Sequence, residues 1–227
     1  MLQIVYQDEY FVAINKPHGL LVHKSPIATD VQEFAVQLLQ EQLERKVFPI
    51  HRLDRKTSGI LIFALSSEYA KAMQTIFVND NTKKIYWAIV RGYFPDEIEV
   101  DYALTNDKGK VQEAVTSFKT FTRSELNIPL GKFETSRYSF IQASPKTGRM
   151  HQIRKHLSHL HHPIIGDRPH GCNKQNRMFK EKWNMMTMLL HAKEMHFTHP
   201  ITEEPIILRA PLFSTFENMI KELQLKH

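Results

Sequence analysis

The sequence contains a single cysteine and no long apolar run, and both absences limit what the protein can be. Cys172 cannot form a disulfide within the chain, which is typical of a reducing compartment, so we expect a cytoplasmic location. The longest clearly apolar run, ILIFAL at 60–65, is far shorter than the roughly 20 residues that span a bilayer, so no membrane segment is expected. The first ten residues include Asp8 and show no basic segment followed by an apolar one, so we expect no secretory signal.

The glycine-rich loops that bind nucleotide cofactors are also missing. Neither GxGxxG nor GxxxxGK[ST] occurs, so no cofactor is expected. Histidines are frequent near Cys172, and the spacing of His156 and His159 would suit a shared zinc ion. HExxH and CxxC are absent, however, and phosphate contacts and helix packing explain these histidines better, so we expect no metal site.

Positive charge is concentrated in one part of the sequence. Lys and Arg number 30 against 24 Asp and Glu, which gives a net charge of +6. The window 145–180 holds eight of these cations and one acid, Asp167, so it carries +7 while the remaining chain is close to neutral at −1. A localised basic surface is typical of a polyanion partner, usually nucleic acid, with a solvated charged face as the alternative.

The apolar periodicity and the turn signals predict an α+β fold with a mainly antiparallel or mixed central sheet flanked by helices. Strands without regular helical crossovers argue against a doubly wound parallel fold, and no repeat or linker interrupts the chain, so a single domain over 1–227 is predicted. Helices are expected from about 29–30 to 46, after Ser66 or Ser67, at 151–160 and at 213–225. Strands are expected at 2–7, 10–16, 59–66, 84–92, 98–104, 113–121, 133–143, 189–200 and 205–210.

The stretch HRLDRKTSG, residues 51–59, places one carboxylate between two guanidinium groups. Arg52 and Arg55 would favour the ionised form of Asp54. The Thr-Ser-Gly that follows supplies hydroxyls and a flexible glycine, which can fix a loop through hydrogen bonds to the backbone. A salt bridge at a loop–strand junction is the structural alternative to a reactive carboxylate.

Two further stretches contain candidate site residues. KTGRMHQIRKHLSHLHHPIIGD, residues 146–167, begins with a turn and enters a helix that carries Arg154, whose planar guanidinium suits a bidentate pair with a carboxylate elsewhere in the fold. Arg149 and Lys155 flank it as candidate phosphate ligands. Tyr86, in KIYWA at 84–88, lies in a predicted strand beside basic residues, and is either a core residue or a platform on which a base stacks.

Taken together, these motifs resemble those of the RluA-type pseudouridine synthases. The similarity runs from about residue 3 to residue 212 and includes, in family order, NKPHGLLVH, HRLDRKTSG, KIYWAIVRG, KTGRMHQIRKHLSHLHHPIIGD and LLHAKEMHFTHP. The resemblance implies the catalytic fold of that family without an S4 domain, and a monomer is favoured. The stretch from Ser136 to Gly171, followed by NKQNR, is most similar to members that modify uridine 65 of tRNA, so tRNA is the expected partner.

The resemblance also implies a role for each matching residue. Asp54 is the catalytic aspartate, and Arg52 enters the RNA stack in place of the flipped base. Tyr86 stacks on the target uracil, and Arg154 pairs with the catalytic aspartate. The uracil pocket is lined by two aliphatic residues, Ile153 and Leu190.

Two other functions fit parts of the sequence. One is the same isomerisation on large-subunit ribosomal RNA, although the expected absence of an S4 domain agrees better with tRNA. The other is an RNA-binding module without activity. The intact set of Asp54, Tyr86 and Arg154 speaks against that module, because binding alone needs no buried carboxylate facing a polyanion.

Overall fold

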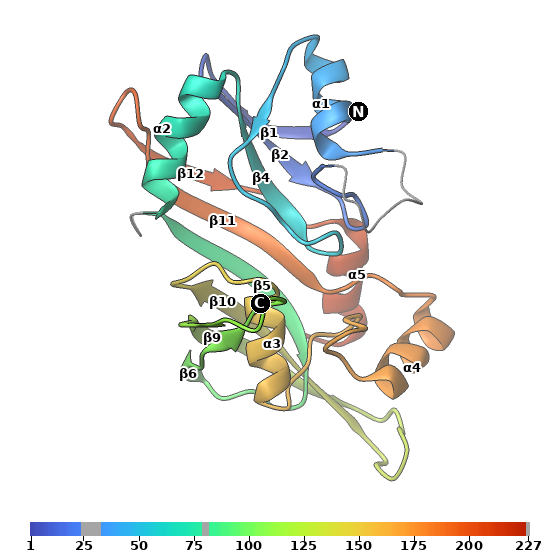
Figure 1. The fold of residues 1–227 in the computed structure, drawn as a ribbon. Helices are drawn as coiled ribbons and strands as arrows, with labels where there is room; N and C mark the ends of the chain where they lie inside the picture. Colours follow the sequence, from blue (N-terminus) through green and yellow to red (C-terminus); the bar gives the residue numbers. More distant parts are fainter. Residues whose placement is uncertain (24–32, 79–81, 226–227) are drawn as a thin grey trace. The chain divides into compact units, whose positions relative to one another are not determined.

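The computed structural model of the protein describes residues 1–23, 33–78 and 82–225 (Figure 1). The chain divides into two compact units: Met1–Lys84 with Ala192–Pro211, and Ile85–His191 with Leu212–His227. Both units combine strands and helices, which confirms the α+β prediction. The expectation of one domain over the whole chain stays a prediction.

The first unit is built on a sheet whose two central strands are completely buried. These are β2 and β4, paired antiparallel with Phe11 opposite Ala64 and Lys16 opposite Gly59. The strand order is β1 (Gln3–Gln7), β2 (Phe11–Lys16), β4 (Ser58–Ala64) and β11 (Leu190–Thr198), with β3 (Phe48–Pro49) beside β4 and β12 (Pro205–Arg209) beside β11. Continuous apolar runs of this kind are typical of strands covered on both faces.

Two helices, α1 (Ala35–Leu43) and α2 (Ser67–Val78), belong to the same unit. Helix α2 contributes Ala70 and Met73 to the core beneath it. Its start follows the predicted cap, because the backbone N–H of Tyr69 donates to Ser66 Oγ at 3.1 Å. This cap fixes the point at which the chain leaves β4 and turns back over the sheet.

The second unit contains an antiparallel sheet that is covered on both faces. Its strand order is β5 (Lys83–Arg91), β10 (Ser136–Pro145), β9 (Val115–Leu126) and β6 (Glu97–Asp101), with a separate pair formed by β7 (Leu104–Thr105) and β8 (Val111–Gln112). Side chains alternate between faces: Ala88 and Val90 of β5 face one core, and Ile89 faces the other. Leu157 of α3 (Gln152–His159) packs into the first core. Figure 1 shows this helix beside β9 and β10.

The opposite core of this unit is closed by α4 (Asn173–Trp183) and α5 (Ser214–Glu222). Phe179 of α4 and Phe216 of α5 pack there against Tyr138 and Phe140 of β10. Helix α5 agrees with the predicted amphipathic segment, whereas α4 was not predicted.

Several predicted boundaries differ from the structure. The predicted helix start at 29–30 lies outside the described residues. In the described part, Phe34 is extended and the helix runs from Ala35 to Leu43, where Glu44 adopts φ 51° and ends it before Lys46. Strand β10 begins at Ser136 rather than at 133, because Leu130 and Phe133 close a tight turn in which Gly131 has φ 64°. None of the helices in the described ranges has the length and apolar content that a bilayer crossing requires.

Candidate active site

Asp54 lies in a tight turn that leads into β4 of the first unit. The backbone N–H of Thr57 donates to the Asp54 carbonyl at 3.0 Å and closes this turn. Leu53, Thr57 and Ser58 around it are buried, while Asp54 is half-buried and Arg52 is exposed. The turn is therefore anchored from within, and it places a carboxylate and a guanidinium where a ligand can reach them.

Close backbone packing requires the glycine that ends this motif. Gly59 has φ 106°, and a Cβ built on it would collide with the backbone carbonyl of Ala192 in the neighbouring strand. Any other residue would combine a strained backbone with this collision. Gly59 is thus needed where the Asp54 turn joins the sheet.

A buried lysine lies beneath the Asp54 turn. Lys16, at the end of β2, is fully buried, and its ammonium donates to the carbonyls of Pro17, Leu20 and Arg55 at 3.0, 2.9 and 3.2 Å. Burial lowers the pKa of Lys16 from 10.5 to about 7, while the negative charge of Asp54 acts in the opposite direction. Lys16 therefore joins the loop after β2 to the turn that carries Asp54.

The same two loops are joined by two further hydrogen bonds, one between their backbones and one from the Arg55 side chain. Gly19 N donates to the Arg55 carbonyl at 2.8 Å, and Arg55 Nε donates to the Gly19 carbonyl at 3.1 Å. His18 belongs to the loop after β2; burial and the nearby charges of Lys16, Lys56 and Arg55 lower its pKa to about 4. The surroundings of Asp54 in this unit are consequently rich in positive charge.

His51, the first residue of the motif, has a structural role. It stacks on Phe77 of α2, with ring centroids 5.3 Å apart, and its Nε2 accepts the N–H of Ile62 at 3.2 Å. Burial lowers the pKa of His51 to about 3, so the ring is neutral and able to accept. This contact fixes the start of the turn relative to β4.

In the second unit, Arg154 of α3 forms a buried bidentate ion pair with Asp167. Arg154 Nε lies 2.7 Å from Asp167 Oδ2, and Nη2 lies 2.8 Å from Oδ1; the two side chains are 4% and 1% exposed. Burial alone would raise the pKa of Asp167, but the hydrogen bonds and charge of Arg154 outweigh it, so the pKa lies below its usual value. Asp167 therefore fixes the orientation of the guanidinium through one of its two edges.

The turn before α3 is organised by the buried side chain of Gln152. Its Oε1 accepts from Thr147 Oγ1 at 2.8 Å and from the backbone N–H of Arg149 at 2.9 Å. Its Nε2 donates to the carbonyl of Val115 and to Thr116 Oγ1 on β9. Arg149 is held further by a hydrogen bond from its Nε to the Glu113 carbonyl at 2.9 Å.

The histidines on and after α3 take part in packing and local hydrogen bonds. His159 stacks on Tyr102 with centroids 3.9 Å apart, and His156 Nε2 lies 3.0 Å from the Tyr102 carbonyl. His151 Nδ1 lies 2.9 Å from His170 Nε2. Within the described ranges, no group of three His, Cys, Asp or Glu residues is arranged to hold a metal ion.

The predicted uracil-pocket residues come together in one apolar cluster. Ile153 and Leu190 are buried in the core on the α3 side of the sheet, and Tyr86 of β5 packs against that core while half-exposed. Tyr86 lies opposite Ala143 in the antiparallel register. A half-exposed aromatic ring beside aliphatic side chains is the arrangement that a stacked base requires.

The structure places the predicted residues in two sets. Asp54 and Arg52 belong to the first unit, whereas Tyr86, Arg149, Ile153, Arg154, Lys155 and Leu190 belong to the second. The pairing of Arg154 with Asp54 stays a prediction, as do the individual roles. Sequence reasoning missed Lys16 and Asp167, whose burial the sequence does not signal.

Comparison with known proteins identifies the family of the chain. The model of the RNA pseudouridylate synthase family matches residues 10–159, which include both the Asp54 turn and α3. The chain belongs to this family, and it is an RNA pseudouridine synthase, an isomerase. The family resemblance drawn from its motifs is confirmed.

Individual proteins similar to this chain carry more specific names. The chain is 44% identical to "tRNA pseudouridine synthase C" of Vibrio cholerae over 98% of its own length and 96% of that protein. It is 43% identical to the protein of the same name in Haemophilus ducreyi, over 97% and 95%. Among solved structures, "Human RNA Pseudouridylate Synthase Domain Containing 4" matches with a TM-score of 0.75 and 25% identity, covering 98% of this chain and 93% of that one.

Proposed function

We propose that the protein converts uridine 65 of tRNA to pseudouridine, with Asp54 as the catalytic carboxylate. The observation that carries the proposal is the identity of 44% with a tRNA pseudouridine synthase over nearly the full length of both chains. The Asp54 motif, the Arg154 helix and Tyr86 all lie inside the matched length. The assignment to position 65 rests on the stretch 136–171 and the residues that follow it, which are similar to those of family members that modify uridine 65 of tRNA.

The reaction breaks the N1–C1′ bond of uridine, turns the uracil and joins its C5 to C1′; the proton lost from C5 is balanced by one gained at N1. Nothing is oxidised and no group is added. A retaining glycosidase begins in the same way, with a carboxylate beside an electron-poor C1′, and then needs a second carboxylate to activate water. Here the departing uracil is recaptured, so one carboxylate suffices and water must be excluded.

The Asp54 turn supports this use of a single carboxylate. Asp54 is half-buried in a turn that Lys16, Gly19 and Arg55 brace through three hydrogen bonds. A carboxylate held in one orientation is effective because the reacting atoms start in the right geometry. The cations Lys16 and Arg55 lie around this carboxylate and give it positively charged surroundings.

Base flipping gives roles to Arg52 and Tyr86. Extruding a base from a helical stack costs a few kcal/mol. Stacking of the flipped uracil on Tyr86 would return about 1–3 kcal/mol. Arg52 is exposed at the start of the Asp54 turn, and its guanidinium would occupy the gap that the base leaves.

The test maps the modification in cells. The gene is deleted in its host, total RNA is treated with a carbodiimide that marks pseudouridine, and reverse-transcription stops are read across tRNA and ribosomal RNA. We expect one mark to disappear at position 65 of tRNA, and to return with the wild-type gene but not with Asp54→Ala. Loss of a ribosomal mark instead would move the substrate to ribosomal RNA, and unchanged marks would remove the proposal.

A further inference from the structure

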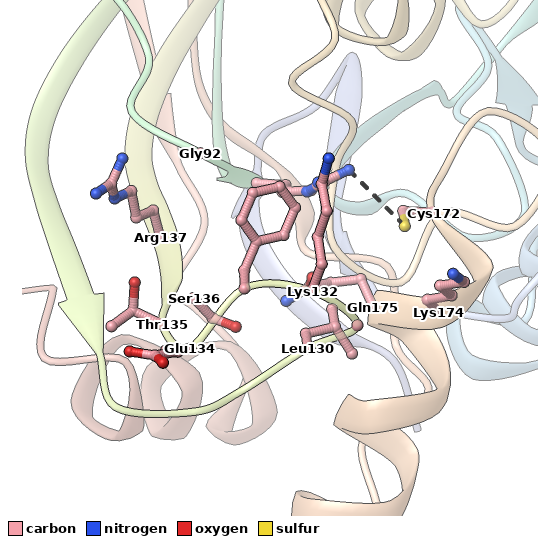
Figure 2. Close-up of a pocket in the computed structure, with 13 residues that line it drawn as sticks. Gly92, Leu130, Lys132, Glu134, Thr135, Ser136, Arg137, Cys172, Lys174 and Gln175 are labelled. Carbon is pink, nitrogen blue, oxygen red and sulfur yellow. Dashed lines mark hydrogen bonds between the residues drawn. The ribbon is translucent and has the colours of Figure 1, made fainter.

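A pocket in the second unit is lined by none of the residues of the uracil-pocket cluster, Tyr86, Ile153 and Leu190. It has a volume of about 560 Å³ and is enclosed between the β9–β10 hairpin loop and the start of α4. Volumes of a few hundred Å³ are typical of sites that accept a small ligand or a single nucleotide. Figure 2 shows Leu130 and Lys132 of the hairpin loop facing Cys172 and Lys174.

The chemistry of this pocket is that of an anion site. Four cations and one carboxylate line it. Arg137 is already engaged, because it pairs with Glu125 at 3.1 Å and lies over the ring of Tyr93. Lys132 and Lys174 are exposed, and in the part of the chain that the structure describes neither has an ion-pair partner.

The start of α4 adds to this positive potential. Its N-cap residue, Cys172, makes no side-chain cap hydrogen bond, so the first amides of this helix of 11 residues lack a side-chain cap. Cys172, Lys174 and Gln175 at this end of the helix line the pocket. Helix N-termini of this kind bind phosphate groups through those amides and the helix dipole. Arg91, whose Nη1 lies 4.0 Å from Cys172 Sγ, places a guanidinium at the same point.

The hairpin loop contributes an aromatic surface beside these cations. Phe133 is 54% exposed, and the ammonium of Lys132 lies 5.5 Å from its ring centroid. The turn that carries both is rigid, because Leu130 and Phe133 exchange backbone hydrogen bonds. An exposed aromatic ring next to phosphate-binding groups is the arrangement with which proteins hold an unpaired nucleotide.

The position of the pocket determines which nucleotide can occupy it. Arg91 lies five residues beyond Tyr86 on β5, about 17 Å along the strand, and the alternation of the strand directs it to the opposite face. A nucleotide next to a uridine stacked on Tyr86 would not reach from Tyr86 to Arg91. A part of the folded RNA that is distant in sequence from this uridine could reach the pocket at Arg91.

We propose that this pocket binds an unpaired nucleotide of the folded tRNA, outside the stem that is modified. A phosphate would lie against Arg91, Lys174 and the first amides of α4, and a base would stack on Phe133 beside Lys132. The proposal rests on the proposed tRNA substrate, and it gives the protein a way to select a complete tRNA over an isolated stem-loop.

The test compares two RNAs: full-length tRNA and a stem-loop that contains only the modified stem. We expect the double variant Lys132→Gln, Lys174→Gln to bind full-length tRNA about tenfold more weakly, with the slope of log affinity against log salt reduced by about 1–2. Phe133→Ala should weaken binding of full-length tRNA about fivefold or more, whereas Phe133→Trp should bind this RNA as the wild type does. Stem-loop binding and the saturated rate on tRNA should not change.

The control is Lys182→Gln, which removes an exposed lysine from the other end of α4 and should leave both affinities unchanged. Wild-type affinity of all pocket variants for tRNA would overturn the proposal, and so would an equal loss on the stem-loop. Loss of hexaglutamate binding with tRNA binding intact would assign the pocket to an acidic protein segment and overturn it too. If the wild-type enzyme releases no tritium from 5-tritiated tRNA, the proposed function fails. The affinities of the wild type and the pocket variants for the two RNAs would still test the pocket.

Discussion

Arg154 and Asp167 form a buried ion pair in which two guanidinium N–H groups meet two carboxylate oxygens at 2.7 and 2.8 Å. The family resemblance implied that Arg154 pairs with the catalytic aspartate, Asp54, and that pairing stays a prediction. The structure shows that Asp167, thirteen residues along the chain, also pairs with Arg154. Asp167 is also the one acid in the basic window 145–180. The buried pair with Arg154 therefore neutralises the acid of that window. The other seven Lys and Arg residues of the window account for its positive charge.

We expect Asp167→Asn to destabilise the protein by about 3 kcal/mol, because it removes the charge that compensates a buried guanidinium. Since the pKa of Asp167 is lowered in the folded state, its contribution to stability is present above the ordinary carboxyl pKa and is lost as pH falls through the lowered value. Urea unfolding should thus show a constant difference from wild type between about pH 5 and 8 that shrinks in acid. Glu97→Gln, which breaks an exposed pair with Lys119, is the control and should change stability little.

Asp54→Asn should reduce tritium release from 5-tritiated tRNA by a factor of at least about 1000, because no second carboxylate is assigned to the reaction. The fold should be retained, since Asp54 is only half-buried. Asp107→Asn, in an exposed loop, is the matched control and should keep wild-type activity. Appreciable turnover by purified Asp54→Asn would remove Asp54 from its proposed role.

The stability contribution of Lys16 should depend on pH in the alkaline range. Because burial lowers its pKa from 10.5 to about 7, the unfolded chain binds this proton more tightly than the folded protein does between those values. The free energy of unfolding of the wild type, relative to Lys16→Met, should therefore rise from about pH 7 toward pH 10 and stay flat below pH 7. Urea unfolding at pH 6, 7.5 and 9 measures it.

Lys71→Met, on the exposed side of α2, is the control for Lys16 and should give a difference that does not vary with pH. In the background of Asp54→Asn, the rise should begin at a lower pH, because the charge that favours the ammonium is gone. A constant difference between wild type and Lys16→Met at all three pH values would contradict the prediction.

Gly59→Ala should cost more stability than Gly109→Ala. Both glycines have positive φ, 106° and 76°, so both substitutions strain the backbone. At Gly59 the new methyl would also collide with the Ala192 backbone, whereas at Gly109 it would enter open space. We expect the difference between the two variants to be about 1–3 kcal/mol in urea unfolding; equal values would show that β4 and β11 separate without cost.

The elements that sequence reasoning found are those whose local pattern is unambiguous. The apolar run of β4 and the turn signals around β11 and β12 predicted strands close to their observed limits. Helix α4 was missed because its sequence is polar, with Phe179 and Gln175 as its buried residues, so its place is decided by packing against β10. A helix that is stabilised mainly by tertiary packing can lack the apolar periodicity from which a helix is predicted.

The site shows the same division. Asp54, Arg154 and Tyr86 were predicted as site residues because they belong to motifs, and their roles stay predictions. Ile153 and Leu190 lie in one cluster with Tyr86. Lys16 and Asp167 were not found, because a lysine or an aspartate in a sequence gives no sign that it is buried. Their partners are backbone carbonyls and a guanidinium that the fold brings to them.

The side chain of Gln152 also has a consequence for motion. Since it bonds to the turn at Thr147 and Arg149 and to Val115 and Thr116 of β9, that turn cannot open unless it separates from the strand. Its amide protons should exchange with solvent together with those of β9, as one cooperative segment. Arg149 would then meet RNA from a backbone that is ordered before binding, and little conformational entropy is lost when the complex forms.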